Sequence, residues 1–475
     1  MFPSEVLLEI FSCYVEGSYI GGAWHILASV CRRWKSIALE SPRRLNHRIF
    51  CYEICSRSGR ASPSLRKKLD FWPPFPIVLT AYFFPELKPI SREDDILVTL
   101  EHHDRVREVN LLDFSISLWE KILPLLQKPF PMLTDLHLHA FRYGLGMESI
   151  APGSFLGGSA PRLRKLRLDG LPFPGLPKLL LSTTDLVRLD LDDIPDSGYI
   201  TPEAMITCIS ALTKLEHLLL RFGSHRSRPE EREKQCRSPQ TRSLLPSLTF
   251  FKFKGASEYL EDIADRIDAP LLNRLRISFF HQPIFDTPRL AQFISRTPNF
   301  KEWDRVKVYL WDFLVTVTVI SHPMTSYDTI LELDYRYPES GQPDFQPSSF
   351  GQQCTSCFPQ HLISMVKSLV ISGEEDRMDP GLWRELLQSF SGLKNLHLVP
   401  KIAPRFAIVL QGLVGEDGTQ TLPVLQNIFL EERQPIPEGI QKFVSARKLA
   451  GQAVSATPIT RPWDKNFARI HYRQL

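Results

Sequence analysis

The sequence predicts an α/β chain in which a small helical module precedes a long array of strand–helix repeats. Two observations support this fold class. Apolar residues recur with helical spacing over the first 45 residues. Farther along, a Leu-x-x-Leu-x-Leu pattern recurs at steps of 23 to 36 residues. One short strand with its connecting helix buries too little apolar surface to be stable alone, so such repeats must stack on one another.

The composition of the 475-residue chain restricts the classes of partner. Lys and Arg number 57 against 53 Asp and Glu, and a net charge of +4 gives no reason to expect nucleic acid or a membrane as a partner. The 8 cysteines are scattered, which favours free thiols in a reducing compartment. We find no signal peptide, and the longest apolar run, residues 313–320, is too short to span a bilayer. The chain is therefore expected in the cytoplasm or the nucleus.

The helical module begins after Pro3 and Ser4, which suit the first turn of a helix, and Pro42 ends it. A first apolar stripe consists of Val6, Leu7, Ile10, Phe11 and Tyr14. A second, after Gly21-Gly22, consists of Leu27, Val30, Cys31, Trp34, Ile37 and Ala38. The spacing predicts an antiparallel helical hairpin or a three-helix unit. Because so small a unit buries little surface, it should pack against a neighbour.

Residues 1–45 resemble an F-box, the module that docks a substrate receptor onto the Skp adaptor of a cullin–RING ubiquitin ligase. The resemblance assigns to the adaptor contact, or to the module's own core, Phe2, Pro3, Val6, Leu7, Ile10, Phe11, Leu27, Val30, Cys31, Trp34 and Ile37. Within this set we predict that Pro3, Leu7, Ile10 and Phe11 supply the contact and that Trp34 anchors the core. The family's closing Pro-x-Leu-Trp is absent, since Arg43-Arg44-Leu45 follows Pro42. The alternative is a helical cap for the array, because repeat arrays need capped ends.

The repeats resemble a leucine-rich-repeat array with a parallel inner sheet and outer helices. The pattern begins at Leu133, Leu163, Leu186, Leu215, Leu248, Leu272, Val366, Leu393 and Leu425, with looser copies at Val106, Trp303 and Ile330. Helical stretches are predicted over 116–126, 202–212, 259–267, 290–294 and 382–390. Asparagines expected a few residues past each strand are missing, which predicts an irregular solenoid. We place a connector at 46–92 with a first strand at Ile77–Tyr82, the array at 93–445 and a tail at 446–475.

We find no catalytic, cofactor-binding or metal-binding constellation in the sequence. Cys354-x-x-Cys357 lacks a second Cys or His pair at zinc spacing, and His361 alone does not complete a site. His102-His103 has no partner motif. Phosphate-binding loops, dinucleotide fingerprints and hydrolase motifs are also absent. The sequence therefore predicts a chain that is not itself an enzyme.

A target-binding surface is predicted on the strand face opposite the leucines, because side chains alternate along a strand. The predicted patch consists of Arg221, Phe250, Lys252, Lys254, Arg274 and Arg276. No acidic residue stands at these positions, so the patch suits an acidic or phosphorylated segment. The alternative is a solvated face without a ligand.

The sequence leaves two functions open. The layout, an F-box followed by such repeats, resembles the expanded F-box family of mushroom-forming fungi. It implies a substrate-recognition subunit of a Skp–cullin–F-box ubiquitin ligase, in which the array binds a protein target. The alternative is a non-degradative leucine-rich-repeat scaffold whose N-terminal helices only cap the solenoid. A stoichiometric Skp adaptor in the purified protein would distinguish the two.

Overall fold

The computed structural model describes most of the chain as helices, strands and their connections. The described residues are 2–17, 24–40, 45–52, 65–82, 93–140, 154–173, 175–223, 242–280, 287–301, 303–311, 314–320, 330–336, 358, 360–373, 380–413, 421–431 and 435–459. The chain forms two compact units, Met1–Glu233 and Lys234–Leu475.

The first unit begins with three helices, as one of the two sequence alternatives predicts. They are α1 (Ser4–Gly17), α2 (Trp24–Val30) and α3 (Arg32–Glu40). The second apolar stripe is split at Cys31, whose Sγ accepts a hydrogen bond from the Trp34 amide at 3.4 Å at the start of α3. The Trp34 ring lies 4.9 Å from the ring of Phe11 in α1. The three helices therefore share one small core.

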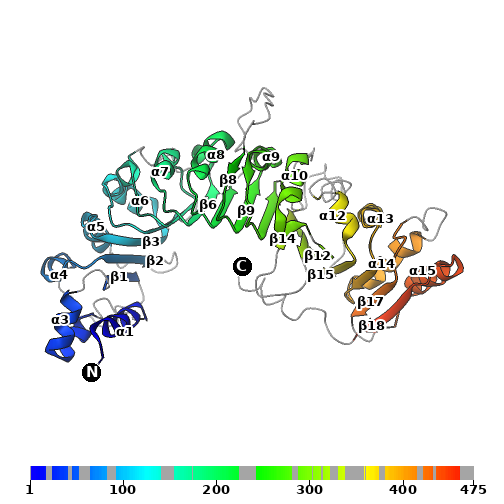
Figure 1. Ribbon diagram of the computed structural model, residues 1–475, viewed down its shortest axis with the longest axis horizontal. Coiled ribbons are helices and arrows are strands. Elements are labelled where there is room, and N and C mark those ends of the chain that lie inside the picture. Colours follow the sequence, from blue (N-terminus) through cyan, green and yellow to red (C-terminus); the bar gives the residue numbers. More distant parts are fainter. Residues whose placement is uncertain are drawn as a thin grey trace. The chain divides into compact units, whose positions relative to one another are not determined.

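Seven parallel strands follow, and each pairs with the next one along the chain. They are β1 (His47–Tyr52), β2 (Ile77–Tyr82), β3 (Val106–Phe114), β4 (Asp135–Ala140), β5 (Lys165–Asp169), β6 (Arg188–Ile194) and β7 (His217–Phe222). The connections contain α4 (Leu65–Phe71), α5 (Glu93–Glu101), α6 (Ile116–Ile122), η2 (Leu125–Gln127), η3 (Phe155–Gly158), α7 (Leu176–Ser182), η4 (Asp196–Gly198) and α8 (Pro202–Ser210). Figure 1 shows α5 to α8 along one face of this sheet. The predicted first strand is in fact the second, because β1 lies within the predicted connector.

The strands alternate between buried and partly exposed positions, as the leucine pattern predicts. In β4 Leu136, Leu138 and Ala140 are buried, and His137 and His139, which alternate with them, are partly exposed. β5 and β7 repeat this alternation. The leucines thus face the helices and form the core, and the residues between them form the opposite face of the sheet. This opposite face is called the polar face below.

The second unit departs from the predicted all-parallel order. Its main strands, in spatial order, are β9 (Phe250–Gly255), β11 (Arg274–Phe279), β14 (Ile330–Arg336), β13 (Leu314–Ile320), β12 (Arg305–Trp311), β15 (Ser368–Gly373), β16 (Asn395–Leu398), β17 (Asn427–Glu431) and β18 (Ser455–Ile459). β13 runs antiparallel to both β12 and β14, so β12 and β14 exchange the places that sequence order would give them. The other neighbouring pairs within this unit are parallel. The prediction of a purely parallel sheet is wrong at this point.

The sequence of β13 explains why this segment forms a strand. β13 reads Leu-Val-Thr-Val-Thr-Val-Ile, and its β-branched residues favour the extended backbone. Val317 and Val319 are buried, while Thr316 donates from Oγ1 to the Asp334 carboxylate of β14 at 2.8 Å. Ser278 of β11 donates to the other oxygen of Asp334 at 3.2 Å. The Asp334 carboxylate thus links β11, β13 and β14.

Helices α9 (Ser257–Arg266), α10 (Pro288–Arg296) and α13 (Pro380–Ser389) confirm three predicted helical stretches. The unit also contains α12 (Gln360–Met365), α14 (Ala403–Gly412), α15 (Glu438–Leu449), η5 (Pro298–Phe300), and β8 (Ser243–Leu244) paired with β10 (Ile267–Asp268). Because α15 ends at Leu449 and β18 pairs with β17, the array extends into the predicted tail.

A polar ladder joins the first residues of four neighbouring strands in the second unit. Asn427 donates to Asn395 at 2.9 Å, and Asn395 donates to Ser368 at 3.3 Å. Ser455 donates to the Asn427 side chain at 2.9 Å. Asparagines are expected past each strand of such an array, whereas this ladder lies at the starts of the strands.

Glu261 in α9 caps the N-terminus of the neighbouring helix α10. Its carboxylate accepts from the amides of Arg289 at 3.0 Å and Leu290 at 2.7 Å, which satisfies two N–H groups of the first turn. We expect Glu261→Ala to lower the free energy of unfolding by about 1–3 kcal/mol, because these buried donors would lose their acceptor. Urea unfolding measures the change. Glu258→Ala, an exposed residue of the same helix, is the control and should have little effect; equal losses would contradict the cap.

Candidate interaction surfaces

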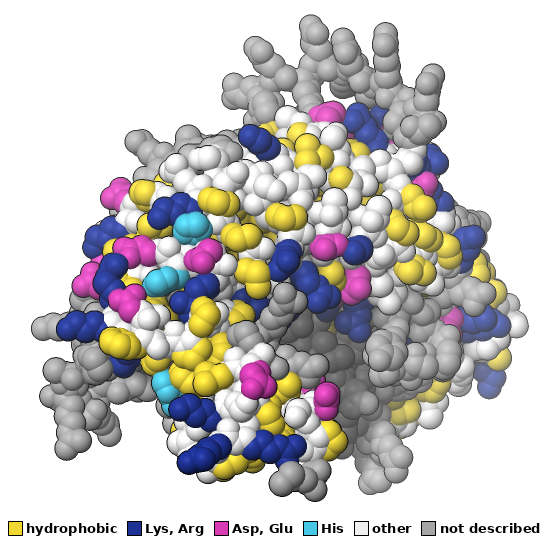
Figure 2. Space-filling view, turned by 60° about the vertical axis from the view of Figure 1, so that its left-hand side comes forward, with side chains coloured by type: hydrophobic (Ala, Val, Ile, Leu, Met, Phe, Trp, Pro, Cys, Tyr) yellow, Lys and Arg dark blue, Asp and Glu magenta, His cyan; other side chains and the backbone are white. Residues whose placement is uncertain are grey.

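The helical module exposes an apolar stripe. Val6, Ile10 and Tyr14 recur every four residues along α1, and they are 41–45% exposed. Phe2 precedes the helix at 65% exposed, and α2, which packs against α1, adds Ile26 and Val30. Hydrophobic side chains that repeat along one helix face and remain in contact with water form a candidate interaction surface. Figure 2 shows hydrophobic side chains beside basic ones in its lower part, where the module lies.

The other half of the predicted contact set lies in the module's core. Leu7, Phe11, Leu27 and Ile37 are buried and pack in one cluster with Trp24 and Phe75. The prediction that Leu7 and Phe11 supply the contact therefore needs correction, because a side chain already enclosed in a core cannot also face a partner. Ile10 and Pro3 are exposed, as that prediction requires, and so is Cys31. Trp34 is partly buried against the core, as predicted. The residues Pro42 to Arg44 lie outside the described residues.

An aromatic cluster joins the module to the start of the array. The Trp24 ring lies 5.7 Å from the ring of His47 in β1 and 5.4 Å from that of Phe75. Trp72 stacks on His47 at 4.9 Å, and His47 is fully buried. The module is thus packed on the first repeat, so its buried face caps the sheet while its apolar stripe stays exposed. A capping role explains the buried face of the module, but it does not explain the exposed apolar stripe.

The buried imidazole of His47 predicts acid sensitivity of this junction. Burial lowers the pKa of His47 to about 4, although its Nε2 lies 2.7 Å from the carbonyl oxygen of Pro73. Between pH 6.5 and 4 the unfolded chain therefore binds more protons, so stability is complete above pH 6.5 and falls as the pH drops toward 4, by up to about 3 kcal/mol. We expect His47→Gln, which cannot be protonated, to flatten this pH dependence of urea unfolding. His102→Gln is the control, and an unchanged slope in His47→Gln would contradict the assignment.

On the polar face of the first unit, three side chains surround the carboxylate of Asp190. Arg188 donates from Nε to Asp190 Oδ2 at 2.8 Å. Arg167 Nε lies 3.1 Å from the same oxygen, and His217 Nδ1 lies 3.0 Å from Oδ1. The Asp190 side chain is only 3% exposed. Burial would raise the pKa of this carboxyl, but the imidazole of His217 and the guanidinium of Arg188 outweigh it and hold the pKa below its usual value. Burial and the nearby Arg167 lower the pKa of His137 to about 4, so His137 is neutral at pH 7.

Ion pairs continue around this group. Lys165 pairs with Asp135 at 2.8 Å. His139 lies 3.0 Å from Asp113 and 3.5 Å from Asp169. Figure 2 brings the N-terminal part of the chain forward and shows basic, acidic and histidine side chains interspersed there. This group is not among the predicted site residues, although Lys165, Arg167, Arg188 and Asp190 occupy alternating strand positions that point to it.

The predicted basic patch does not form a purely cationic surface. Arg221 belongs to the first unit and pairs with Asp192 at 3.1 Å. In the second unit, Arg276 lies 3.4 Å from the Glu332 carboxylate, and both side chains are largely shielded. Glu332 reaches this position because β14, and not β12, is the neighbour of β11. The remaining patch residues lie on the polar face of β9 and β11, where Phe250, Lys252, Lys254 and Arg274 are all partly exposed.

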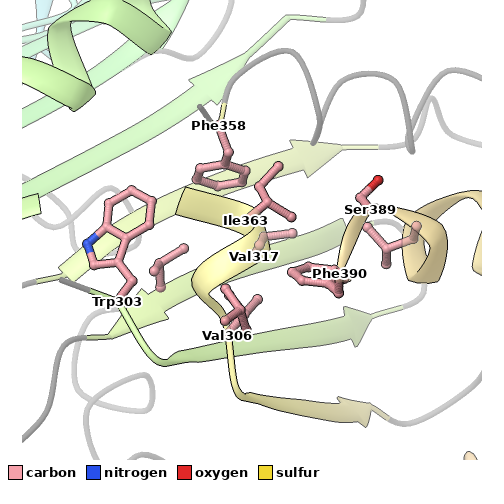
Figure 3. Close-up of a pocket in the computed structure, with 10 residues that line it drawn as sticks. Trp303, Val306, Val317, Phe358, Ile363, Ser389 and Phe390 are labelled. Carbon is pink, nitrogen blue, oxygen red and sulfur yellow. The ribbon is translucent and has the colours of Figure 1, made fainter. Parts of the chain in front are cut away.

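A small apolar cavity lies between β12, β13 and the helices α12 and α13 of the second unit (Figure 3). Trp303, Phe358 and Phe390 contribute its aromatic walls. The volume open to the centre of a water-sized sphere is about 20 Å³. This is room for about one water, and the lining side chains are apolar apart from Ser389, so that water would find few hydrogen-bond partners. The cavity is a packing defect and not a ligand site.

Within the described ranges, no group of three or more His, Cys, Asp or Glu side chains is arranged to hold a metal ion. Cys354, Cys357 and the side chain of His361 lie outside those ranges. The helices that the structure describes include none with the length and apolar character that a membrane crossing requires.

No protein-family model and no curated protein matches this sequence. Among solved structures, the leucine-rich repeat-containing protein LegL7 from Legionella pneumophila is similar over 78% of this chain and 97% of its own. The two sequences are 14% identical in this comparison, and the TM-score is 0.30.

Proposed function

We propose that this chain is the substrate-recognition subunit of a Skp–cullin–F-box ubiquitin ligase. In this proposal the apolar stripe of α1 and α2 docks onto the Skp adaptor, and the polar face of the repeat array binds a protein target. The chain contributes no catalytic residue. It raises the effective concentration of the target's lysines near the ubiquitin-loaded enzyme.

The exposed stripe is the observation that carries the proposal. Val6, Ile10 and Tyr14 stand on the water-facing flank of a helix whose adjacent side, with Leu7 and Phe11, already fills the core. Exposed helix residues of this kind supply the anchors of helix-mediated interfaces. The alternative function, a scaffold capped by these helices, is favoured by the Trp24 junction but gives no role to the stripe.

The test is a titration of the full chain with purified Skp adaptor, followed by size-exclusion chromatography with light scattering. A complex of one chain of 54.6 kDa with one adaptor is the expected result. A chain that remains monomeric at micromolar adaptor concentrations would favour the scaffold function and exclude the ligase subunit.

A further inference from the structure

Two guanidinium groups of the first unit are held in place by one buried carboxylate. The Arg167 and Arg188 side chains remain 47% and 38% exposed, whereas the Asp190 side chain between them is 3% exposed. Both arginines use the same oxygen, Oδ2. Because Asp190 already restricts these two long side chains, a ligand would lose little of its binding energy to ordering them.

Both guanidinium groups keep donors for a ligand. Arg167 contacts Asp190 through Nε, which leaves its two Nη groups, and Arg188 contacts it through Nε and Nη2, which leaves Nη1. Two positive charges therefore stand over one negative charge, and the positive ones are nearer the solvent. Lys165 is in register with Arg188, and its own charge is balanced by Asp135. The local excess of charge on the solvent side is positive.

The rest of the polar face limits where an anion can lie. Asp169 and Asp192 follow two residues after Arg167 and Asp190, toward the carboxyl ends of β5 and β6. They contact His139 and Arg221 respectively. An acidic ligand would be repelled at this edge of the sheet and attracted at Arg167 and Arg188. The charge distribution thus determines where on the polar face an acidic ligand is attracted and where it is repelled.

We propose that Arg167 and Arg188 form a docking site for an acidic segment of a partner protein, whose carboxylates accept the remaining guanidinium N–H groups. Arginine suits this task because its planar fork presents parallel donors to a carboxylate. If the chain is a ligase subunit, the partner is its target, and only that identification rests on the proposed function. The site itself does not depend on adaptor binding.

The test uses the full chain and a synthetic Gly-Glu-Asp-Glu-Gly peptide with blocked ends. Its Gly-Gln-Asn-Gln-Gly counterpart has the same shape without the charge. Arginine Nε–Hε signals of nitrogen-15-labelled protein report the site, and Arg167→Lys and Arg188→Lys each assign one signal. We expect the acidic peptide to shift both signals, to bind at least tenfold more tightly than the amide peptide, and to weaken with added salt.

Arg167→Lys plus Arg188→Lys keeps both positive charges beside Asp190, so the fold should persist while the paired donors are lost. We expect at least fivefold weaker binding of the acidic peptide to this variant. Lys214→Gln, which removes an exposed ion pair with Asp185, is the control and should bind as the wild type does. Equal binding of the acidic and amide peptides, or of the double variant and the wild type, would overturn the site.

Two further titrations distinguish this proposal from binding of a phosphorylated segment and from the proposed ligase function. A phosphoserine peptide that shifts the signals while the acidic peptide does not would overturn the assignment to carboxylates. Adaptor titration of the double variant should match the wild type. A wild type that binds the peptide but no adaptor would refute the ligase function and leave this site standing.

Discussion

Replacing Trp24 with alanine is expected to lower the free energy of unfolding of the N-terminal unit by about 3–5 kcal/mol, the usual range for a buried tryptophan. Trp24 is the side chain through which α2 meets both the module's own core and the first repeat, at His47 and Phe75. Its removal leaves a cavity at this junction, and the packing around it cannot collapse without moving β1. Urea unfolding followed by tryptophan fluorescence and circular dichroism measures the loss.

The junction also predicts where the structure opens. Amide hydrogen exchange in Trp24→Ala should quicken in α1 to α3 before it quickens in β3 to β7, because these strands have their own core of leucines. Phe71→Ala is the matched control: it also removes an aromatic ring near the junction, but Phe71 is 90% exposed. Its effect should stay within about 0.5 kcal/mol. Equal effects of the two changes would show that Trp24 does not join the module to the array.

The second large effect is expected on adaptor binding. Val6→Asp plus Ile10→Asp places two charges on the exposed stripe of α1, and we expect at least a hundredfold weaker binding of the Skp adaptor. Truncation of a buried interface anchor typically costs about 2 kcal/mol, and desolvating an unpaired carboxylate costs more. Calorimetric titration measures the change. The free energy of unfolding should change little, because both side chains already contact water.

A matched control is available in the second unit. Ile408 in α14 is 61% exposed, and Ile408→Asp makes the same chemical change outside the stripe. It should leave adaptor binding intact. Wild-type affinity in the double variant, or an equal loss in Ile408→Asp, would remove the stripe from the interface. Leu7→Asp is not a useful probe, because Leu7 lies in the core and the change would unfold the module.

The sequence predicts those parts of the fold that depend on local periodicity. Leucines three and two residues apart identify strands such as β4 to β7, because a strand must bury one face whatever its neighbours are. Helices α8 to α10 are likewise visible from their apolar spacing. β13 carries an equally clear Val-Thr-Val-Thr-Val alternation, but this run is not among the predicted strands.

The sequence does not show which strands and helices become neighbours in the fold. The exchange of β12 and β14 depends on pairing across the insertion, and it brings Glu332 beside Arg276, which changes the predicted basic patch. The stripe of α1 was visible as a set of apolar residues, but its division into core and surface depends on the packing of α3 and Phe75. The Asp190 group requires three strands in register before Arg167, Arg188 and His217 can meet.

Hydrogen exchange of the full chain with and without the Skp adaptor locates the proposed adaptor contact on α1 and α2 without a mutation. We expect slower exchange in α1 and α2, at residues 4–17 and 24–30, and unchanged exchange in the strands of the array. Unchanged exchange in these helices at saturating adaptor, or protection confined to the repeats, would contradict the proposed contact.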